Sequence, residues 1–394
     1  MVRGVLRFPV SEAVDIRAGV TRIHFAIASL LLLLSACDEE ELRPRDPLPA
    51  TQVDAGVDAV ADAPIEKRDG AFCPPPLGTP APRPAARPAA GPLDDVLRMN
   101  HLQAKATHNS YHVQKPGALA EYAYTHQPLD VQLDAQGVRA LELDVHFDDE
   151  CQRHEVLHLP LIDDATTCRT LPECLGAVRK WSDGHLGHHP LFIMVEPKDD
   201  SAYEAALRLD VLEKEILSVF PREAIITPDE VKGDAPSVSA AIAKGWPTLA
   251  KTRGRVLFFL LASGGMRDEY THAGKDLSGR LMFVSSSVGE PYASIAVIDE
   301  PTYRRDDIDA SIAAGMIVRT LAEDFTALET APAQSKAALE SGAQMIATNY
   351  PAKIASSTWA FENPGTPSRC NVATAPSSCT SGAIESPDRL VTPR

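Results

Sequence analysis

The chain has 394 residues, of which 44% are hydrophobic and 23% are charged. These proportions are typical of a globular protein rather than a disordered one, and the length allows one large domain or two of ordinary size. The formal net charge of −16 argues against a nucleic-acid partner, because binding to phosphates needs basic patches. An acidic site for a divalent cation is compatible with this charge.

Residues 1–37 have the pattern of an export signal. Four arginines precede a short apolar run that ends in small residues and Cys37. This pattern is typical of a signal peptide, and the run is too short for a transmembrane helix. Its end, Leu34-Ser35-Ala36-Cys37, resembles a bacterial lipobox, in which the cysteine is lipidated. We expect an exported lipoprotein anchored in a membrane through Cys37 and facing the periplasm or the cell exterior. The alternative is an ordinary signal peptide with a coincidental cysteine.

The other cysteines indicate disulfides rather than a metal site. They are Cys73, Cys151, Cys168, Cys174, Cys370 and Cys379. An even number in an exported chain favours disulfides, and six cysteines allow 15 connectivities. Proximity in the sequence favours Cys168–Cys174 and Cys370–Cys379. Zinc is not expected, because the chain contains no CxxC pair.

The composition divides the remaining chain into three parts. Residues 38–98 are rich in proline, alanine and aspartate, which predicts a disordered tether. Residues 99–352 form the predicted folded domain, and residues 353–394 form a C-terminal tail that a Cys370–Cys379 disulfide would staple. We expect a monomer.

The predicted domain alternates short apolar runs with helix-like stretches. After a first strand in residues 105–111, strands are predicted within 139–147, 190–198, 254–262, 280–287, 294–300, 315–323 and 342–350. Several runs lack apolar/polar alternation, as expected for strands covered on both faces. Helices are predicted within 168–184, 202–220, 237–252, 304–315 and 325–342. Eight parallel strands over about 250 residues predict an α/β fold, a (β/α)8 TIM-like barrel. An open doubly wound sheet is the alternative, but no glycine-rich loop follows the first strand.

Polar residues lie where these strands end, which is where active sites form in such barrels. They are His108, Asn109, Glu142, Asp144, His158, Glu196 and Lys198. Carboxylate and carboxamide oxygens suit Ca²⁺ or Mg²⁺, and the histidines can act as acid and base. A cation, two histidines and a lysine together suit phosphodiester cleavage.

Several of these segments resemble a known family. THNSYH, YTHQPLDVQLDAQGVRALELDV, VLHLPLIDDATTCRTLPECL and GMIVRTLAE are similar to the bacterial calcium-dependent phosphatidylinositol-specific phospholipase C family, over residues 99–352. The resemblance implies a TIM-like barrel of the phospholipase C-like phosphodiesterase type, Ca²⁺ as cofactor and a phospholipid substrate at a membrane surface. It also implies cleavage of phosphatidylinositol to diacylglycerol and inositol phosphate by attack of the inositol 2-hydroxyl.

The resemblance further implies a role for each matched position. The calcium ligands would be Asn109, Glu142, Asp144 and Glu196. Glu142 is also a candidate base for the 2-hydroxyl, while His108 would stabilise charge at phosphorus and His158 would protonate the diacylglycerol oxygen. Lys198 and Arg319 match less closely and are candidates for substrate binding. Glu323 departs from the aspartate expected at its position.

Two alternatives remain open from the sequence. A glycerophosphodiester phosphodiesterase has a related barrel, but its first histidine usually precedes Arg-Gly, whereas His108 precedes Asn-Ser. The second alternative is a non-catalytic lipoprotein that binds inositol phosphates. Polar residues outside the proposed site are expected to have ordinary roles: His112 as a surface or supporting group, Asp163 as a loop or cap residue, and residues 185–189 as a solvated loop.

Overall fold

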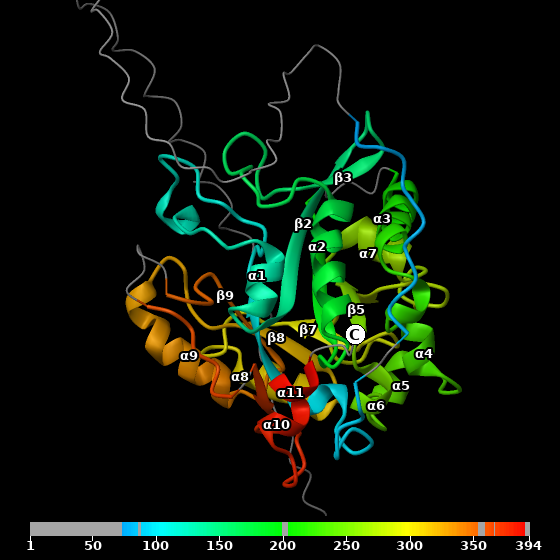
Figure 1. Ribbon diagram of the computed structural model, residues 1–394, viewed down its shortest axis with the longest axis vertical. Coiled ribbons are helices and arrows are strands. Elements are labelled where there is room, and N and C mark those ends of the chain that lie inside the picture. Colours follow the sequence, from blue (N-terminus) through cyan, green and yellow to red (C-terminus); the bar gives the residue numbers. More distant parts are fainter. Residues whose placement is uncertain (1–72, 86–87, 199–203, 354–358, 366, 391–394) are drawn as a thin grey trace, which may run out of the picture. The chain divides into compact units, whose positions relative to one another are not determined.

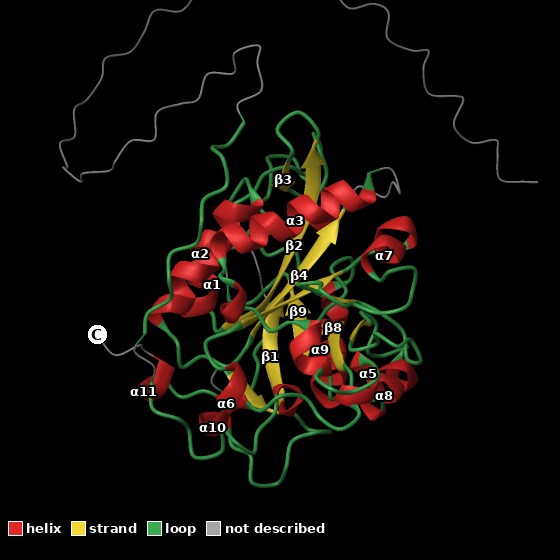
Figure 2. Cartoon of the chain, turned by 90° about the vertical axis from the view of Figure 1, so that its right-hand side faces the viewer, coloured by secondary structure: helices red, strands yellow, loops and turns green. Residues whose placement is uncertain are grey.

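The computed structural model describes residues 73–85, 88–198, 204–353, 359–365 and 367–390 (Figures 1 and 2). Cys37, the predicted signal and most of the predicted tether lie outside these residues. None of the helices in the described ranges is long and apolar enough to cross a membrane.

Eight parallel strands form the centre of the fold. They are β1 (Leu102–Thr107), β2 (Val138–Asp148), β4 (Leu191–Pro197), β5 (Val256–Leu260), β6 (Phe283–Val284), β7 (Ile295–Val297), β8 (Ile317–Leu321) and β9 (Met345–Thr348). Their order is β6-β5-β4-β2-β1-β9-β8-β7. A single parallel bridge, Ser285–Ile295, links β6 to β7. The barrel is therefore nearly closed, and the predicted TIM-like fold is confirmed.

Helices lie around the outside of these strands (Figure 2). They are α1 (Leu129–Asp134), α2 (Leu171–Gly184), α3 (Ala205–Val219), α4 (Pro228–Lys232), α5 (Val238–Ile242), α6 (Leu249–Thr252), α7 (Gly264–Tyr270), α8 (Arg305–Ala313), α9 (Ala331–Glu340), α10 (Ser381–Ile384) and α11 (Pro387–Leu390). The single helix predicted in residues 237–252 is wrong. Gly245 adopts a φ of 115° and Pro247 lacks an amide hydrogen, so the stretch divides into α5 and α6.

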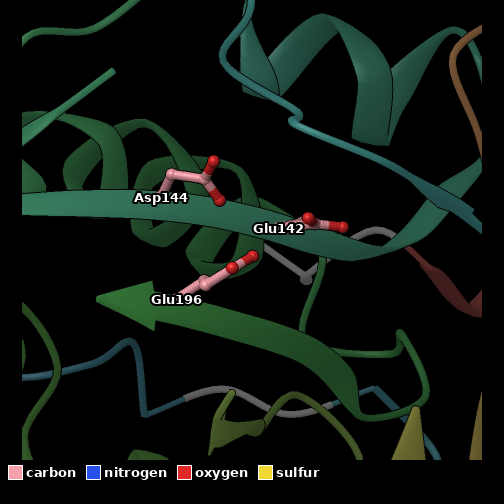
Figure 3. A group of neighbouring side chains, drawn as sticks. All are labelled: Glu142, Asp144 and Glu196. Carbon is pink, nitrogen blue, oxygen red and sulfur yellow. The ribbon is translucent and has the colours of Figure 1, made fainter. Parts of the chain in front are cut away.

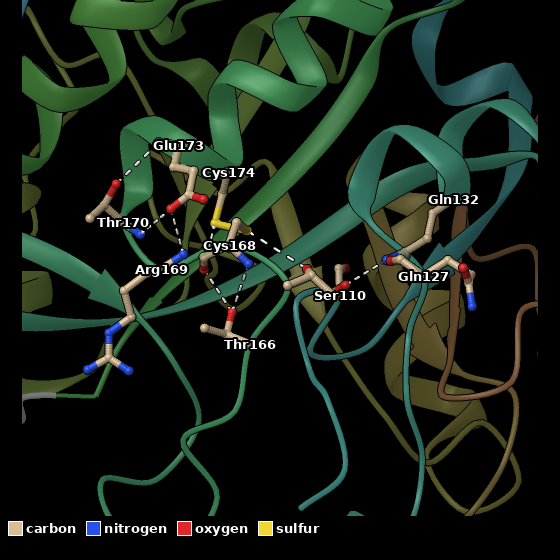
Figure 4. Close-up of a disulfide and its surroundings, with 10 residues drawn as sticks. Ser110, Gln127, Gln132, Thr166, Cys168, Arg169, Thr170, Glu173 and Cys174 are labelled. Atoms are coloured by element: carbon tan, nitrogen blue, oxygen red, sulfur yellow. Dashed lines mark hydrogen bonds between the residues drawn. A yellow bond between two sulfur atoms is a disulfide. The ribbon is translucent and has the colours of Figure 1, made fainter. Parts of the chain in front are cut away.

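The start of α2 shows how local sequence determines one of these helices. The Thr170 side chain accepts from the Glu173 amide, and the Glu173 carboxylate accepts from the Thr170 amide, so the two residues form a capping box. The predicted disulfide Cys168–Cys174 is present across this first turn (Figure 4). The helix then buries Leu175 and other apolar side chains of one face against the barrel.

The core lies on both sides of the strands. On β4, Leu191, Ile193 and Val195 join the cluster that contains side chains of α2 and α3. Phe192 and Met194, between them in sequence, join a second cluster with residues of β1, β5 and β8. Both faces of β4 are therefore apolar, which explains why its sequence lacks the alternation of a half-exposed strand.

Two short strands extend the sheet beyond the barrel. β3 (Arg153–Val156) pairs antiparallel with the end of β2, and β10 (Ser368–Cys370) pairs antiparallel with the start of β1. β10 belongs to the C-terminal tail, in which the predicted disulfide Cys370–Cys379 is present. The tail therefore packs on the amino-terminal end of the strands, opposite the strand ends that carry the polar residues.

The described part of the predicted tether differs from expectation. Residues 73–85 lie along α2 and α3, and Cys73 is joined to Cys151 by a disulfide (Figure 1). Arg83 makes an ion pair of 2.8 Å with Asp183 of α2. The predicted tether therefore does not extend to residue 98. A disulfide and the contacts of a buried arginine hold residues 73–85 on the barrel.

Residues 185–189 also differ from the predicted solvated loop. His188 and His189 are fully buried at the base of the barrel. Nε2 of His189 lies 2.7 Å from the Ser368 hydroxyl. The backbone amide of His189 donates to the carboxylate of Glu385 in the tail. These histidines therefore help to attach the tail, and nothing in their contacts indicates a metal site.

Candidate active site

Three carboxylates gather on the paired strands β2 and β4. Glu142 and Asp144 are two positions apart on β2, so their side chains project from the same face of the strand. The parallel register places Asp144 beside Glu196 of β4. One oxygen from each carboxylate lies within 4.8 Å of the others (Figure 3). The pairing of β2 with β4 therefore brings these three carboxylates together.

Two cationic side chains contact this acidic cluster. Lys198 Nζ lies 3.0 Å from Asp144 Oδ2 and 2.9 Å from Glu196 Oε1. Arg319 from β8 forms ion pairs with Glu142 and with Asp299. Four carboxylates thus face two cations, which leaves a formal charge of −2 when every group is ionised. That deficit suits a divalent cation.

Burial makes the carboxylates of this cluster costly to ionise. Burial raises the pKa of Glu142, although Arg319 opposes this, and burial together with the charge of Glu142 raises the pKa of Asp144 well above its usual value. Burial lowers the pKa of Lys198, but Asp144 and Glu196 outweigh it, so that the lysine pKa is raised. Buried carboxylates that are costly to ionise favour the binding of a cation, which removes that cost.

Asn109 is a candidate source of a neutral oxygen ligand. It follows β1 with a φ of 45°, in the left-handed region that asparagine tolerates better than most residues. Its Nδ2 donates to the Tyr124 hydroxyl at 3.2 Å, whereas its buried Oδ1 has no hydrogen-bond partner among the described residues. An orphaned carboxamide oxygen and three carboxylates make an all-oxygen set that fits Ca²⁺.

His108 follows β1 and points its Nε2 toward the acidic cluster. This nitrogen lies 3.8 Å from Glu142 Oε1, and Nδ1 lies 2.8 Å from the Asn349 carboxamide oxygen. Glu323 is buried and accepts a hydrogen bond from the Asn349 backbone amide, so it supports the residue that orients His108. Burial and the charge of Arg319 lower the pKa of His108 to about 4. His108 is therefore neutral near neutral pH.

His158 lies on the loop after β3 and has a different partner. Its Nδ1 lies 2.9 Å from Asp163 Oδ2, and Tyr122 contacts its ring edge-on at 5.2 Å between centroids. Burial lowers the pKa of His158, while the hydrogen bond to Asp163 opposes this. Asp163 was expected to be a loop or cap residue. It is instead 1% exposed and bonded to the histidine, because the turn that contains it folds inward.

Comparisons with known proteins bear on this arrangement. The profile of the family described as "Phosphoinositide phospholipase C, Ca2+-dependent" matches residues 97–155 and 152–371. The chain belongs to this family. The family is one of Ca²⁺-dependent phosphodiesterases that act on phosphoinositides. A search of curated proteins found no match to the chain.

Solved structures of bacterial phosphoinositide phospholipases C share the fold. Two crystal forms of the apo calcium-dependent phosphoinositol-specific phospholipase C from a Gram-negative bacterium, Pseudomonas sp, match with a TM-score of 0.51 and 21% identity. Each match covers 71% of this chain, and the two matches cover 98% and 97% of the Pseudomonas chains. A Ca²⁺-dependent enzyme from Streptomyces antibioticus gives a TM-score of 0.47, 17% identity, and coverage of 65% and 96%. The Pseudomonas matches show that this chain has the barrel of the phosphoinositide phospholipases C.

The structure adds residues to the predicted site and shows the partners of Arg319. Arg319, a predicted substrate-binding residue, is 4% exposed and engaged by two carboxylates, so it faces the cluster rather than open solvent. Sequence reasoning missed Asp299 and Asn349, which also follow strands of the barrel. The sequence signal that could have identified Asp299 and Asn349 is that each follows closely after a strand, β7 and β9 respectively. It also missed Asp163, for which the sequence carries no local signal.

Proposed function

We propose that this family member is a Ca²⁺-dependent phosphodiesterase that cleaves phosphatidylinositol, or a related inositol phospholipid, to diacylglycerol and inositol phosphate. One observation carries the proposal: three carboxylates that could hold a cation gather in the barrel, and the two candidate histidines have chemically different partners. The cation would be held by Asn109, Glu142, Asp144 and Glu196. When bound, Ca²⁺ supplies polarisation of a phosphoryl oxygen and a lower pKa for a coordinated hydroxyl.

The two histidines have different roles in the proposed reaction. His158 is bonded to a carboxylate, which favours its protonated form, so it is the group suited to protonate the leaving diacylglycerol oxygen. His108 is bonded to a neutral amide and directs Nε2 toward the cluster, where it can bond a phosphoryl oxygen or the 2-hydroxyl. As the inositol oxygen bonds to phosphorus, Glu142 or His108 takes its proton. The bond from phosphorus to the glycerol oxygen then breaks, and that oxygen receives the proton of His158.

Exposed apolar side chains support a lipid surface as the location of the substrate. Leu119 is 58%, Leu161 87% and Ile162 65% exposed, on the two loops around His158. Lys115 joins these loops, because its Nζ donates to the Leu161 carbonyl and pairs with Asp164. Burying such side chains in a membrane contributes about 1.5–3 kcal/mol each. A lipid anchor at Cys37 would hold the exported protein at the same surface.

The direct test is cleavage of phosphatidylinositol vesicles by purified protein. With millimolar Ca²⁺ we expect diacylglycerol and a cyclic or hydrolysed inositol phosphate, and a chelator should abolish their release. Absence of both products would reject the proposal. Release of glycerol phosphate from deacylated glycerophosphodiesters, without action on intact lipid, would identify a glycerophosphodiester phosphodiesterase instead. Binding of inositol phosphates without turnover, unchanged in His108→Ala, would identify a non-catalytic lipoprotein.

A further inference from the structure

His112 lies on the far side of Asp163 from His158 and takes no part in the proposed proton transfers. Its side chain is fully buried, and its ring packs on Tyr124 with centroids 4.2 Å apart. Nδ1 lies 3.0 Å from the backbone carbonyl oxygen of Tyr124. Nε2 lies 2.9 Å from each carboxylate oxygen of Asp163. Both ring nitrogens therefore face oxygens that normally only accept hydrogen bonds.

This geometry sets a hydrogen-bonding requirement for the His112 ring. A carbonyl oxygen and an ionised carboxylate have lone pairs but no hydrogen to donate. A neutral histidine, with a hydrogen on one nitrogen only, would leave two lone pairs facing each other in the protein interior. Leaving a buried polar group unpaired in this way costs about 1–3 kcal/mol. The imidazolium form satisfies all the acceptors and also balances the buried charge of Asp163.

Asp163 connects this ring to the proposed active site. Its Oδ2 accepts from His158 Nδ1 at 2.9 Å, so one carboxylate lies between two histidines. The backbone amide of Asp163 donates to the Leu159 carbonyl at 2.9 Å, and the Leu159 amide donates to the Asp163 carbonyl at 3.0 Å. This closed turn fixes the carboxylate relative to His158.

We propose that His112 is a positioning residue: as a buried cation it fixes and neutralises Asp163, which in turn orients His158 for proton exchange through Nε2. The inference rests on the proposed function, in which His158 protonates the leaving oxygen. Without His112, the full negative charge of Asp163 would hold the His158 proton more tightly. With His112 present, Asp163 still orients the ring, yet His158 can release its proton.

Other charged groups act on His158 and must remain constant in a test. Lys198 and the His108 ring disfavour its protonated form, and Asp163 favours it. Tyr122 covers one side of the ring, and His146 donates to the His158 backbone carbonyl. None of these contacts is altered directly by a substitution at position 112.

The experiment compares three variants of the full chain by NMR titration of the His158 ring. His112→Gln keeps a neutral donor and should raise the pKa of His158, because Asp163 loses its counter-charge. Asp163→Asn removes the negative charge and should lower it. Asp164→Asn is the matched control, since Asp164 pairs with Lys115 at the surface and should leave the His158 pKa unchanged. If the role of His112 were purely structural, His112→Gln and Asp163→Asn would not shift the His158 pKa in opposite directions.

Turnover gives a second readout. His112→Gln and Asp163→Asn should reduce kcat on phosphatidylinositol by about 10²-fold, and should reduce it far less on an inositol phosphodiester with a nitrophenol leaving group, which needs no proton. Equal losses on both substrates would overturn the proposal, as would a His158 pKa that falls or stays constant in His112→Gln.

The titration needs no turnover, so it separates the two proposals. Wild-type protein that cleaves no phosphodiester would reject the proposed function, while the opposite pKa shifts would still establish the role of His112. Should His112→Gln fail to fold, the ¹⁵N shifts of the wild-type His112 ring decide. Two protonated nitrogens at neutral pH support the proposal, and a single-tautomer pattern overturns it.

Discussion

The carboxamide oxygen of Asn349 lies 2.8 Å from Nδ1 of His108, although 241 positions separate the two residues in the sequence. The bond joins the first strand of the barrel to the last, because β1 and β9 are neighbours in the sheet. It leaves His108 with a neutral partner, whereas His158 has a carboxylate.

Loss of this bond should impair catalysis more than stability. In Asn349→Ala the His108 ring is no longer oriented, so we expect kcat on phosphatidylinositol to fall by about 10–100-fold with little change in KM. Asn363→Ala is the control, since that amide bonds to the backbone carbonyls of Gln103 and Pro367 and to neither histidine. Steady-state kinetics together with thermal unfolding test this. An unchanged kcat would show that Asn349 does not position His108.

The cation site should bind Ca²⁺ measurably even without substrate. Glu196 is partly exposed, and its replacement by Gln removes one ligand charge without opening the core. We expect Glu196→Gln to weaken Ca²⁺ binding by about tenfold or more in calorimetry and to reduce the rise in Tm that Ca²⁺ gives the wild type. Glu155→Gln, in a surface pair with Arg169, is the control. Equal Ca²⁺ affinities of the two variants would contradict the assigned site.

The apolar loop tip should matter for vesicles and not for dissolved substrate. Replacing both Leu161 and Ile162 with Ser removes the most exposed apolar side chains near His158. We expect weaker co-sedimentation with phosphatidylinositol vesicles and slower cleavage of them, by about tenfold or more, at constant activity on a soluble short-chain analogue. Val372→Ser is the control, because Val372 is 57% exposed but follows β10 at the opposite end of the barrel. Equal losses on both substrates would argue against a membrane contact.

The C-terminal tail should make stability depend on pH. Burial raises the pKa of Glu385, but Arg139 and His189 outweigh it and hold the pKa at about 2, below the usual 4.5. A lowered pKa contributes stability that is present above about pH 4.5 and is lost as the pH falls toward 2. Burial also lowers the pKa of His189 to about 4 from 6.5, so stability should already decline between pH 6.5 and 4.

Denaturant unfolding over this pH range measures both effects. At pH 7, Glu385→Gln should cost about 3–5 kcal/mol, because it leaves Arg139 buried without its carboxylate. The difference in the free energy of unfolding between this variant and the wild type should shrink below pH 4.5, because the stability contributed by the ionised Glu385 carboxylate is lost there. A difference that is independent of pH would show that the ion pair is not its source.

The sequence by itself determined the barrel and predicted where its candidate site residues lie. Apolar runs on both faces indicated enclosed parallel strands, and the polar residues at their ends were predicted to meet. That reasoning holds for Glu142, Asp144 and Glu196 because all parallel strands of a barrel end at one rim. Local patterns also sufficed for α2, whose capping box lies within four residues of sequence.

Only the tertiary structure decided which partner each reactive group has. Arg319 reaches Glu142 across 177 positions, and His112 reaches Asp163 across 51. Such pairs depend on strand register and on loops that fold inward, neither of which leaves a periodic signal in the sequence. The same holds for the segment at residues 73–85, whose composition resembles a free tether until Cys73 is paired with Cys151. Periodicity is a local property, whereas protonation and orientation of a buried side chain depend on neighbours that the fold brings from elsewhere.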